Sequence, residues 1–421
     1  MRLFVGTFES SGMTTDLADA FGRLGHPATT AMSEAYAWFA HCEYHFDVSR
    51  DIWEVDWERL AHAVEHERPP KKIGPRSTPE QRLHWLLSEH DVFVYVYNSL
   101  WPFSPGPPRW RGAGREFPLL KKLKKKIVSL HIGPDVRHAS AYDQQLASLG
   151  GPGASMKTLY PTWATDKLAR PLRNLRYAEL YSDVIVSQPN QAGLAIRPYT
   201  HFFAPINLSR VRAEIPKREV PVVLHAPSRR DIKGTPEVMQ ALDELEREGV
   251  KFERRFLEGR PNPEVLKEVA NSDVVIDQLH LPMHGRLGVE AMAAGCALAT
   301  CNRQDWEPMP AQRPIWHIDV ANVKTQLRTL LTDRALRVKL ARAGRQHVER
   351  HHGHVAVAKR ILAALERPIL DHHPTFFARH YRLEGGEKVP ERLRRMTAKV
   401  ARLHGLPDGV TLDNLRERGL A

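Results

Sequence analysis

Cysteine is scarce in this sequence. The chain holds three, Cys42, Cys296 and Cys301, an odd count without the paired spacing of a zinc site. We therefore expect no structural disulfide. Cys296 and Cys301 flank a short apolar run, where cysteine acts as a small hydrophobic residue.

Long apolar runs and export signals are also lacking. No stretch reaches the roughly 18 to 20 apolar residues that span a membrane. The opening MRLFVGTFESSG has no charged segment followed by an apolar one, as a signal peptide would. No segment of about 20 to 50 residues recurs, which excludes solenoids and propellers. These absences predict a cytoplasmic globular protein.

Acidic residues are outnumbered. The chain has 61 Lys and Arg against 49 Asp and Glu, a net charge of +12, which favours an anionic partner. Basic residues concentrate at 121–126, KKLKKK, and between Arg360 and Arg418. RNA-binding aromatic motifs and zinc-finger spacings are missing, so we expect no nucleic acid as partner. Two interpretations of the basic segments stay open: peripheral contact with the anionic inner face of a membrane, or solvated helix ends.

Apolar strand-like runs alternate with amphipathic helix-like segments along the 421 residues. This alternation predicts the α/β class, with Rossmann-like, doubly wound parallel sheets. The pattern restarts near residue 217, so we expect domains at 1–206 and 217–365, and a helical tail at 366–421. Helices in the second domain are predicted at 236–249, 262–271 and 288–295. The aromatic-rich stretch from Tyr36 to Trp57 cannot be assigned.

Residues 271–300 hold the first candidate site: a buried-looking strand, a loop with Gly285 and Gly288, and a small-residue helix carrying Glu290. Unpaired amides at a helix start can hold a diphosphate, and a carboxylate can accept hydrogen bonds from two ribose hydroxyls. Glycine lets the backbone approach a ligand closely. A purely structural strand, loop and helix is the alternative.

A second candidate site lies at residues 222–242, VVLHAPSRRDIKGTPEVMQAL. A cation, Lys233, precedes Gly234, with Arg229 or Arg230 as a second cation, and the following helix is predicted to begin with Thr235 as its N-cap. Cations before a helix start form an anion pocket. One basic cluster alone would suit a solvated loop. Two candidate segments in this order, 222–242 followed by 271–300, favour a nucleotide-binding site.

Both segments resemble the nucleotide-sugar site of GT-B glycosyltransferases, in the large bacterial group that includes sucrose, glycogen and surface-polysaccharide transferases. The resemblance implies two Rossmann-like domains facing a cleft, with C-terminal helices that cross back. It also implies a UDP- or GDP-sugar donor, no metal or other cofactor, retention of anomeric configuration, and a glycan or lipid-linked acceptor.

The first half resembles this family at FPLLKKLKKKIVSLHIGPDVRH, through His131, Gly133, Asp135 and Arg137. His131 would contact the transferred sugar, although a core histidine is the alternative. Catalytic roles are implied for His131, Lys233 and Arg229. Donor-binding roles are implied for Gly12, Arg230, Gly234, Asp277, Gln278, His284, Gly285, Arg286, Gly288 and Glu290. Acceptor-side roles are implied for Asp135 and Arg137.

The sequence departs from the family at Pro282, where the first Glu of an acidic pair is expected before Glu290. Sugar recognition would then pass to His284, Arg286 or loop amides. Two alternatives follow: a non-catalytic GT-B module that binds nucleotide or glycan, and a nucleotide-sugar epimerase. The epimerase is disfavoured because the first domain offers no convincing carboxylate pair.

Two further patterns carry less weight. His280 and His284, and the cluster of His351, His352 and His354, lack the carboxylate or cysteine that would complete a metal site. We therefore expect no metal. The loop with Trp101, Phe103 and Trp110 could stack on an acceptor sugar or pack internally.

Overall fold

The computed structural model describes residues 1–9, 11–35, 45–47, 55–74, 76–97, 116–133, 135–150, 154–159, 168–215 and 218–421. The aromatic loop at 101–114 and most of the stretch from 36 to 57 lie outside these ranges. The chain divides into two compact units. Unit 1 comprises Met1–Ala141, Asp166–Phe202 and Ala358–Ala421; unit 2 comprises Tyr142–Thr165 and Phe203–Val357. Each unit is described by itself.

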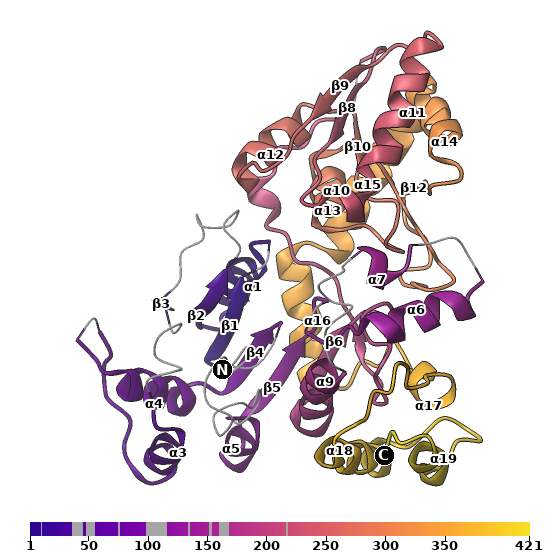
Figure 1. The fold of residues 1–421 in the computed structure, drawn as a ribbon. Helices are drawn as coiled ribbons and strands as arrows, with labels where there is room; N and C mark the ends of the chain where they lie inside the picture. Colours follow the sequence, from indigo (N-terminus) through magenta and orange to yellow (C-terminus); the bar gives the residue numbers. More distant parts are fainter. Residues whose placement is uncertain are drawn as a thin grey trace. The chain divides into compact units, whose positions relative to one another are not determined.

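Unit 1 is built on a parallel sheet of seven strands in the order β3-β2-β1-β4-β5-β6-β7 (Figure 1). The strands are β1 (Leu3–Glu9), β2 (Ala28–Ala35), β3 (Phe46–Asp47), β4 (Val92–Val96), β5 (Lys126–Leu130), β6 (Val184–Ser187) and β7 (Thr200–His201). β1 and β4 are buried along their whole length, as expected for central parallel strands covered on both faces. The strand order reverses between β1 and β4, as in Rossmann folds.

The helices of unit 1 come from three separate parts of the chain. They are α1 (Met13–Arg23), α3 (Trp57–His66), α4 (Pro79–Glu89), α5 (Glu116–Lys122), α6 (Ala139–Ser148, which continues into unit 2), α9 (Ala169–Tyr181), α17 (Phe376–Arg379), α18 (Glu391–His404) and α19 (Leu412–Glu417). Thr78 and Gln81 form a capping box that starts α4.

The C-terminal tail is part of the core of unit 1. Phe377, Tyr381 and Leu415 belong to one buried cluster with Leu172 and Leu175 of α9. The buried side chain of Arg176 on α9 also donates from Nε to Thr397 Oγ1 of α18 at 2.9 Å. The sequence had given no structural role to residues 366–421, because their apolar positions are spread over three short helices.

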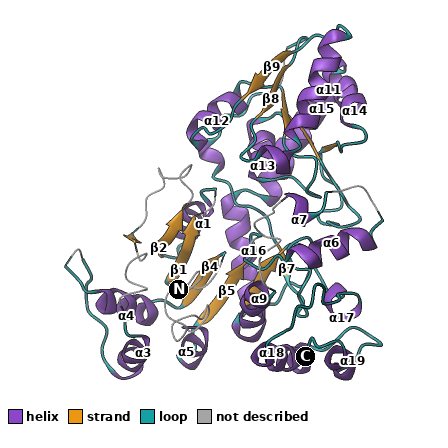
Figure 2. Cartoon of the chain, in the orientation of Figure 1, coloured by secondary structure: helices purple, strands orange, loops and turns teal. Residues whose placement is uncertain are grey.

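Unit 2 has a parallel sheet in the order β12-β11-β10-β8-β9. Figure 2 shows its strands β8 and β9 side by side. The strands are β8 (Val222–His225), β9 (Glu253–Phe256), β10 (Val274–Ile276), β11 (Ala297–Thr300) and β12 (Trp316–His317). The helices are α7 (Met156–Leu159), α10 (Arg230–Lys233), α11 (Thr235–Arg247), α12 (Asn262–Ala270), α13 (Arg286–Ala294), α14 (Val323–Thr332), α15 (Arg334–His351) and α16 (His354–Glu366); a 3-10 turn spans Leu208–Arg210.

Helices cover both faces of this second sheet. Val223 and Ile276 pack with α11 and α14, whereas their strand neighbours Leu224 and Val275 pack with α12 and α13. This alternation follows from the two-residue period of a strand. The prediction of two Rossmann-like parallel α/β units is confirmed. Helix α16 begins in unit 2 and continues in unit 1, so the chain returns to its first unit.

Several predicted boundaries were wrong. The basic loop after β8 contains the four-residue helix α10. Thr235 is not an N-cap: Gly234, with φ of 70°, occupies that position and Thr235 is the first residue of α11. Helix α13 begins at Arg286, two residues before the predicted start. Within the described ranges, none of the helices combines the length and apolar character that crossing a bilayer requires.

Candidate functional site

The carboxyl end of the unit 2 sheet brings the two candidate segments together. β8 and β10 are neighbours, and their register pairs His225 with Ile276. The segment after β8 therefore starts beside the segment after β10. Open α/β sheets bind ligands at this edge, where the strand order reverses.

Lys233 and Asp277 form an ion pair at this edge. Lys233 Nζ donates to Asp277 Oδ1 at 2.5 Å and to Gln278 Oε1 at 3.0 Å. Lys233 is 8% exposed and Asp277 is fully buried. The second carboxylate oxygen, Asp277 Oδ2, accepts from the amide of Gly285 at 2.5 Å. Asp277 thus connects the cation of α10 to the residue that precedes α13.

Each of the three glycines of the site meets a different requirement. A Cβ on Gly285 would lie 3.0 Å from Lys233 Nζ, so this glycine lets the ion pair reach the start of α13. A Cβ on Gly288 would lie 2.6 Å from His284 Cβ and 3.0 Å from Leu298. Gly288 therefore serves helix packing. Gly234 combines a φ of 70° with a Cβ position 2.8 Å from Leu279.

Glu290 lies on α13 with its carboxylate directed towards α12. Its Oε1 accepts from Asn262 Nδ2 at 3.0 Å and from Arg286 Nε at 3.2 Å. Arg286 also donates to the carbonyl of Pro205. Glu290 is 3% exposed. Lys233 is thus linked through Asp277 to Gly285, the residue before α13, and Glu290 lies on the second turn of that helix. Sequence reasoning missed Asn262, because a partner on another helix leaves no local pattern.

The two predicted arginines have other partners. Arg229 donates to Asp231 Oδ2 at 2.9 Å and to the carbonyl of Leu159 at 3.4 Å. Arg230 lies over the ring of Phe256 and 3.7 Å from Glu258. The structure therefore brings Lys233, but neither arginine, against Asp277.

Two histidines beside the ion pair are neutral. Burial lowers the pKa of His225 to about 4. Its Nδ1 lies 2.9 Å from the carbonyl of Ile276 and its Nε2 lies 2.9 Å from Thr235 Oγ1. Nδ1 must therefore carry the proton, and Nε2 accepts from the hydroxyl. Burial also lowers the pKa of His284 to about 4. Sequence reasoning missed His225, although a histidine ending a buried strand was a usable signal.

In unit 1, the predicted residues form one loop after β5. His131 donates its amide to Val186 of β6 at 2.9 Å. Asp135 Oδ1 accepts from the amides of Gly133 at 2.9 Å and Ile132 at 3.2 Å, which closes the turn. Arg137 donates from NH2 to Asn190 Oδ1 at 2.5 Å.

Burial controls the charge of this loop. It lowers the pKa of His131 to about 3, so the imidazole is neutral. It raises the pKa of Asp135 to about 7, against the effect of the two amides. The Nδ1 of His131 and the Oδ2 of Asp135 are buried with no hydrogen-bond partner in the described structure. Gly12, with φ of 73°, is the N-cap of α1, which follows β1.

Other predicted or alternative residues have structural partners. His280 Nε2 lies 3.7 Å from Glu237, and the rings of His351 and His352 pack against Phe203. Among the residues that the structure describes, no three His, Cys, Asp or Glu side chains are arranged to hold a metal ion.

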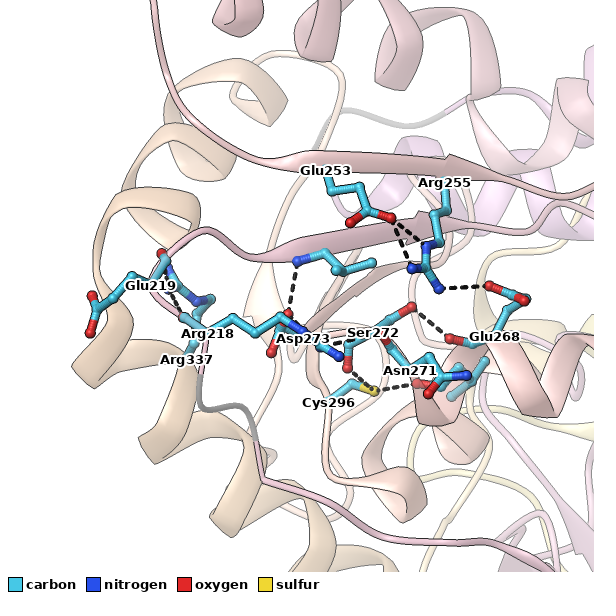
Figure 3. Close-up of polar contacts among 12 residues, drawn as sticks. Arg218, Glu219, Glu253, Arg255, Glu268, Asn271, Ser272, Asp273, Cys296 and Arg337 are labelled. Atoms are coloured by element: carbon cyan, nitrogen blue, oxygen red, sulfur yellow. Dashed lines mark hydrogen bonds and ion pairs between the residues drawn. The ribbon is translucent and has the colours of Figure 1, made fainter.

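The amino end of the same sheet is polar but internally paired (Figure 3). Asp273 Oδ2 accepts from the amide of Val222 at 2.8 Å and from Arg218 at 3.0 Å. Arg255 bridges Glu253 and Glu268. Asp273 thus ties the start of β8 to the residue before β10, and Arg255 ties β9 to α12.

Comparison with known proteins points to the same region. Residues 229–363 match a family described as glycosyl transferase-like, which confirms the resemblance of the second-half motifs. No curated protein matches the chain.

Solved structures with similar folds share little sequence. A sucrose-phosphate synthase from Thermosynechococcus elongatus is 11% identical over 87% of this chain and 98% of its own, with a TM-score of 0.49. HepE of Anabaena, solved in complex with UDP-glucose, is 12% identical over 87% of this chain and 99% of its own, with a TM-score of 0.45. A protein from Listeria monocytogenes that is described as a UDP-N-acetylglucosamine 2-epimerase is 12% identical over 87% of this chain and 96% of its own, with a TM-score of 0.44.

Proposed function

We propose that this two-unit α/β protein, whose residues 229–363 match a family described as glycosyl transferase-like, has the GT-B fold and moves a sugar from a nucleoside diphosphate to an acceptor hydroxyl. The observation that supports this most is the meeting of Lys233, Asp277 and Gly285 at the start of α13, with Glu290 on the same helix. A cation, a helix start and a ribose-binding carboxylate are the three parts that a nucleoside diphosphate needs.

In this proposal the diphosphate binds between Lys233 and the first amides of α13, and Glu290 accepts from the ribose. The buried Lys233 is held by Asp277 and Gln278, so its charge is in place before the donor arrives. As the sugar leaves, negative charge grows on the diphosphate, and Lys233 stabilises the transition state more than the bound donor.

Further details of the reaction are part of the same proposal. The donor is a UDP- or GDP-sugar, the anomeric configuration is retained, and no metal or other cofactor takes part. His131 contacts the transferred sugar as a neutral hydrogen-bonding group, because its pKa of about 3 keeps it uncharged. The loop with Asp135 and Arg137 lies on the acceptor side, and the acceptor is a glycan or lipid-linked sugar of surface-polysaccharide synthesis.

The test is donor turnover by the full chain. UDP- and GDP-sugars are incubated with the protein and a panel of glycan acceptors, and release of nucleoside diphosphate is measured. We expect one donor to be consumed by the wild type and not by Lys233→Ala. Lys251→Ala is the matched control, since Lys251 is exposed near the amino end of β9. Consumption by Lys233→Ala at the wild-type rate would contradict the proposal.

The alternative is a binding module without catalysis. Pro282 supports it: its carbonyl accepts from the amide of Arg303 at 2.9 Å, and its side chain offers no acceptor to a sugar hydroxyl. Saturable UDP or GDP binding, with every tested donor left intact in the presence of acceptors, would favour this module. Conversion of a UDP-sugar to its epimer without any acceptor would favour an epimerase.

We also propose peripheral contact with an anionic membrane, through α18. Lys121 and Lys126 pair with Asp183, and Lys122 pairs with Glu65, so these lysines of the KKLKKK segment have partners within unit 1. Helix α18 presents exposed Arg395, Lys399 and Arg402 along one face, with Leu403 59% exposed beside them; Arg395 also lies 3.4 Å from Glu391 one turn earlier. A basic face with an exposed apolar side chain suits anionic lipid.

A further inference from the structure

A surface cavity of about 400 Å³, open to solvent and lined mostly by exposed residues, lies in the C-terminal tail of unit 1, outside the proposed donor and acceptor regions. It lies between the end of α17 and the segment 408–418 that contains α19; α17 precedes α18 in the chain and α19 follows it, and Figure 1 shows α17 and α19 near each other. Three of the nine lining residues are arginines. The lining consists of Ala378, Arg379, Arg382, Asp408, Gly409, Val410, Asn414, Glu417 and Arg418.

Backbone carbonyls hold the arginines at the cavity wall. Arg418 donates to the carbonyls of Phe377, Ala378 and Tyr381, at the end of α17. Arg382 donates to the carbonyls of Arg379, His380 and Tyr381. Arg379 donates from NH2 to the carbonyl of Asp408 at 3.0 Å. The guanidinium groups of Arg418 and Arg382 thus cap the C-terminal end of α17. Arg379, the last residue of α17, contacts the segment before α19 instead.

The arginines of this cavity differ from others in the tail. Arg394 pairs with Glu391, Arg416 with Asp413, and Arg360 with Asp371. Across 368–421, which the structure describes without a gap, Arg379 and Arg418 form no ion pair, although Asp408 and Glu417 line the same cavity. Arg379 is exposed, so water also solvates its charge, whereas Arg418 is partly buried and its Nε has no hydrogen-bond partner in the described structure.

The charges also oppose one another. Burial and the nearby charge of Arg382 lower the pKa of Arg418. A lowered pKa means that the protein disfavours the charged guanidinium relative to water. An anion bound between these side chains would remove that penalty.

We propose that this cavity, the arginine pocket, binds a phosphate group. Guanidinium groups present paired N–H donors that match phosphate oxygens, and 400 Å³ is large enough for a phosphate monoester. Asn414 and the two carboxylates at the rim can hydrogen-bond hydroxyls carried by the same ligand. The phosphate belongs either to a soluble phosphorylated sugar or to a lipid headgroup.

The first experiment titrates the full chain with inorganic phosphate by calorimetry, at constant ionic strength set with sodium chloride. We expect one saturable site that is weakened about tenfold by Arg379→Gln. Arg416→Gln on α19 is the control, because Arg416 pairs with Asp413 outside the pocket lining. Lys233→Ala must bind phosphate as the wild type does, which separates this pocket from the proposed donor site.

A second variant guards against loss of folding. Glu417→Gln removes a negative charge from the rim and leaves the carbonyl bonds intact, so phosphate should bind several-fold more tightly. Wild-type affinity in both Arg379→Gln and Glu417→Gln would overturn the proposal, as would loss of phosphate binding in Lys233→Ala alone.

An experiment with lipid vesicles distinguishes a lipid headgroup from a soluble phosphorylated sugar as the source of the phosphate. Vesicles of phosphatidic acid in phosphatidylcholine are sedimented with the protein. Binding that inorganic phosphate competes away and Arg379→Gln abolishes assigns the pocket to a lipid headgroup. Phosphate binding in solution, with vesicle binding unchanged by Arg379→Gln, assigns it to a soluble phosphate ester.

Discussion

Lys233 Nζ and Asp277 Oδ1 lie 2.5 Å apart, although 44 residues separate them in the chain. The ion pair closes the gap between the short helix after β8 and the end of β10. Because both side chains are largely shielded from water, neither charge can be removed without leaving the other uncompensated. This pair therefore affects both the stability of unit 2 and the chemistry proposed for it.

A double substitution separates these two effects. Lys233→Met should destabilise the protein by about 3 to 5 kcal/mol, because Asp277 keeps a buried charge. Lys233→Met combined with Asp277→Asn should recover most of that stability in urea unfolding and remain inactive in donor turnover. Recovery of turnover in the double variant would remove Lys233 from the proposed mechanism.

Asn262 is expected to matter for nucleotide affinity through Glu290. Asn262→Ala removes the bond at 3.0 Å that orients the carboxylate, and we expect affinity for the nucleoside diphosphate to fall about tenfold, or about 1.4 kcal/mol. Asn271→Ala, at the other end of α12, is the matched control. Calorimetric binding constants check the prediction; equal values for the two variants would contradict it.

Gly234 should tolerate no side chain. Gly234→Ala places a Cβ 2.8 Å from Leu279, at a residue whose φ is 70°. Because steric overlap adds to backbone strain, we expect the free energy of unfolding to fall by about 2 to 4 kcal/mol. Gly249→Ala is the control, because Gly249 has a φ of 84° but no atom near the added Cβ. It should cost about 1 kcal/mol. Chemical unfolding measures both; equal losses would show that Leu279 gives way.

Asp135 should make unit 1 less stable as pH rises. Its pKa of about 7 in the folded chain exceeds the ordinary value of 3.8, so between these values the folded state holds a proton that the unfolded state releases. Stability from this group is present below pH 3.8 and is lost as pH rises through 7. Asp135→Asn keeps an acceptor for the amides of Ile132 and Gly133. We expect it to raise the free energy of unfolding by about 1 to 3 kcal/mol at pH 8, and little at pH 4. A gain independent of pH would contradict this.

Charge reversal on α18 tests the membrane proposal. Arg395→Glu, Lys399→Glu and Arg402→Glu together should abolish sedimentation with phosphatidylglycerol vesicles, since each basic residue near such a surface contributes about 1 kcal/mol. Lys251→Glu, Lys267→Glu and Lys339→Glu in unit 2 form a control with the same net charge. Loss of binding to the same extent in both would indicate a response to overall charge, and retention in the α18 variant would exclude this face. The same measurement with duplex DNA in place of vesicles tests whether this face of α18 binds nucleic acid.

The fold was predictable because strand periodicity is local. Buried runs such as VVL and VVI contain no polar residue, and the helices between them are long enough to show a period. Helix α10 was missed because four residues cannot show a period of 3.6. The start of α11 was misplaced because Thr235 is a good capping residue, whereas its hydroxyl bonds to His225 in the structure.

The candidate site was predictable only in part. Local patterns placed Lys233 and Glu290 near helix starts, and the fold connects Lys233 through Asp277 to the start of α13, the helix that carries Glu290. The direction of a side chain was not available from the sequence, so Arg229 and Arg230 were grouped with Lys233 although they bond to Asp231 and lie over Phe256. Asn262 reaches Glu290 only through the packing of α12 beside α13.

The position of the C-terminal tail sets an order of events during synthesis. Unit 2 uses no residue beyond Val357, but the core of unit 1 joins Leu172 and Leu175 to Phe377, Leu415 and Leu420. The ribosome must therefore deliver residues as far as Leu420 before this cluster of unit 1 is complete, whereas the cluster around Phe4, Leu83 and Phe93 takes none of its buried residues from the tail. Although domains generally fold from the N-terminus first, here unit 2 can complete its fold while part of the core of unit 1 is still to be synthesised.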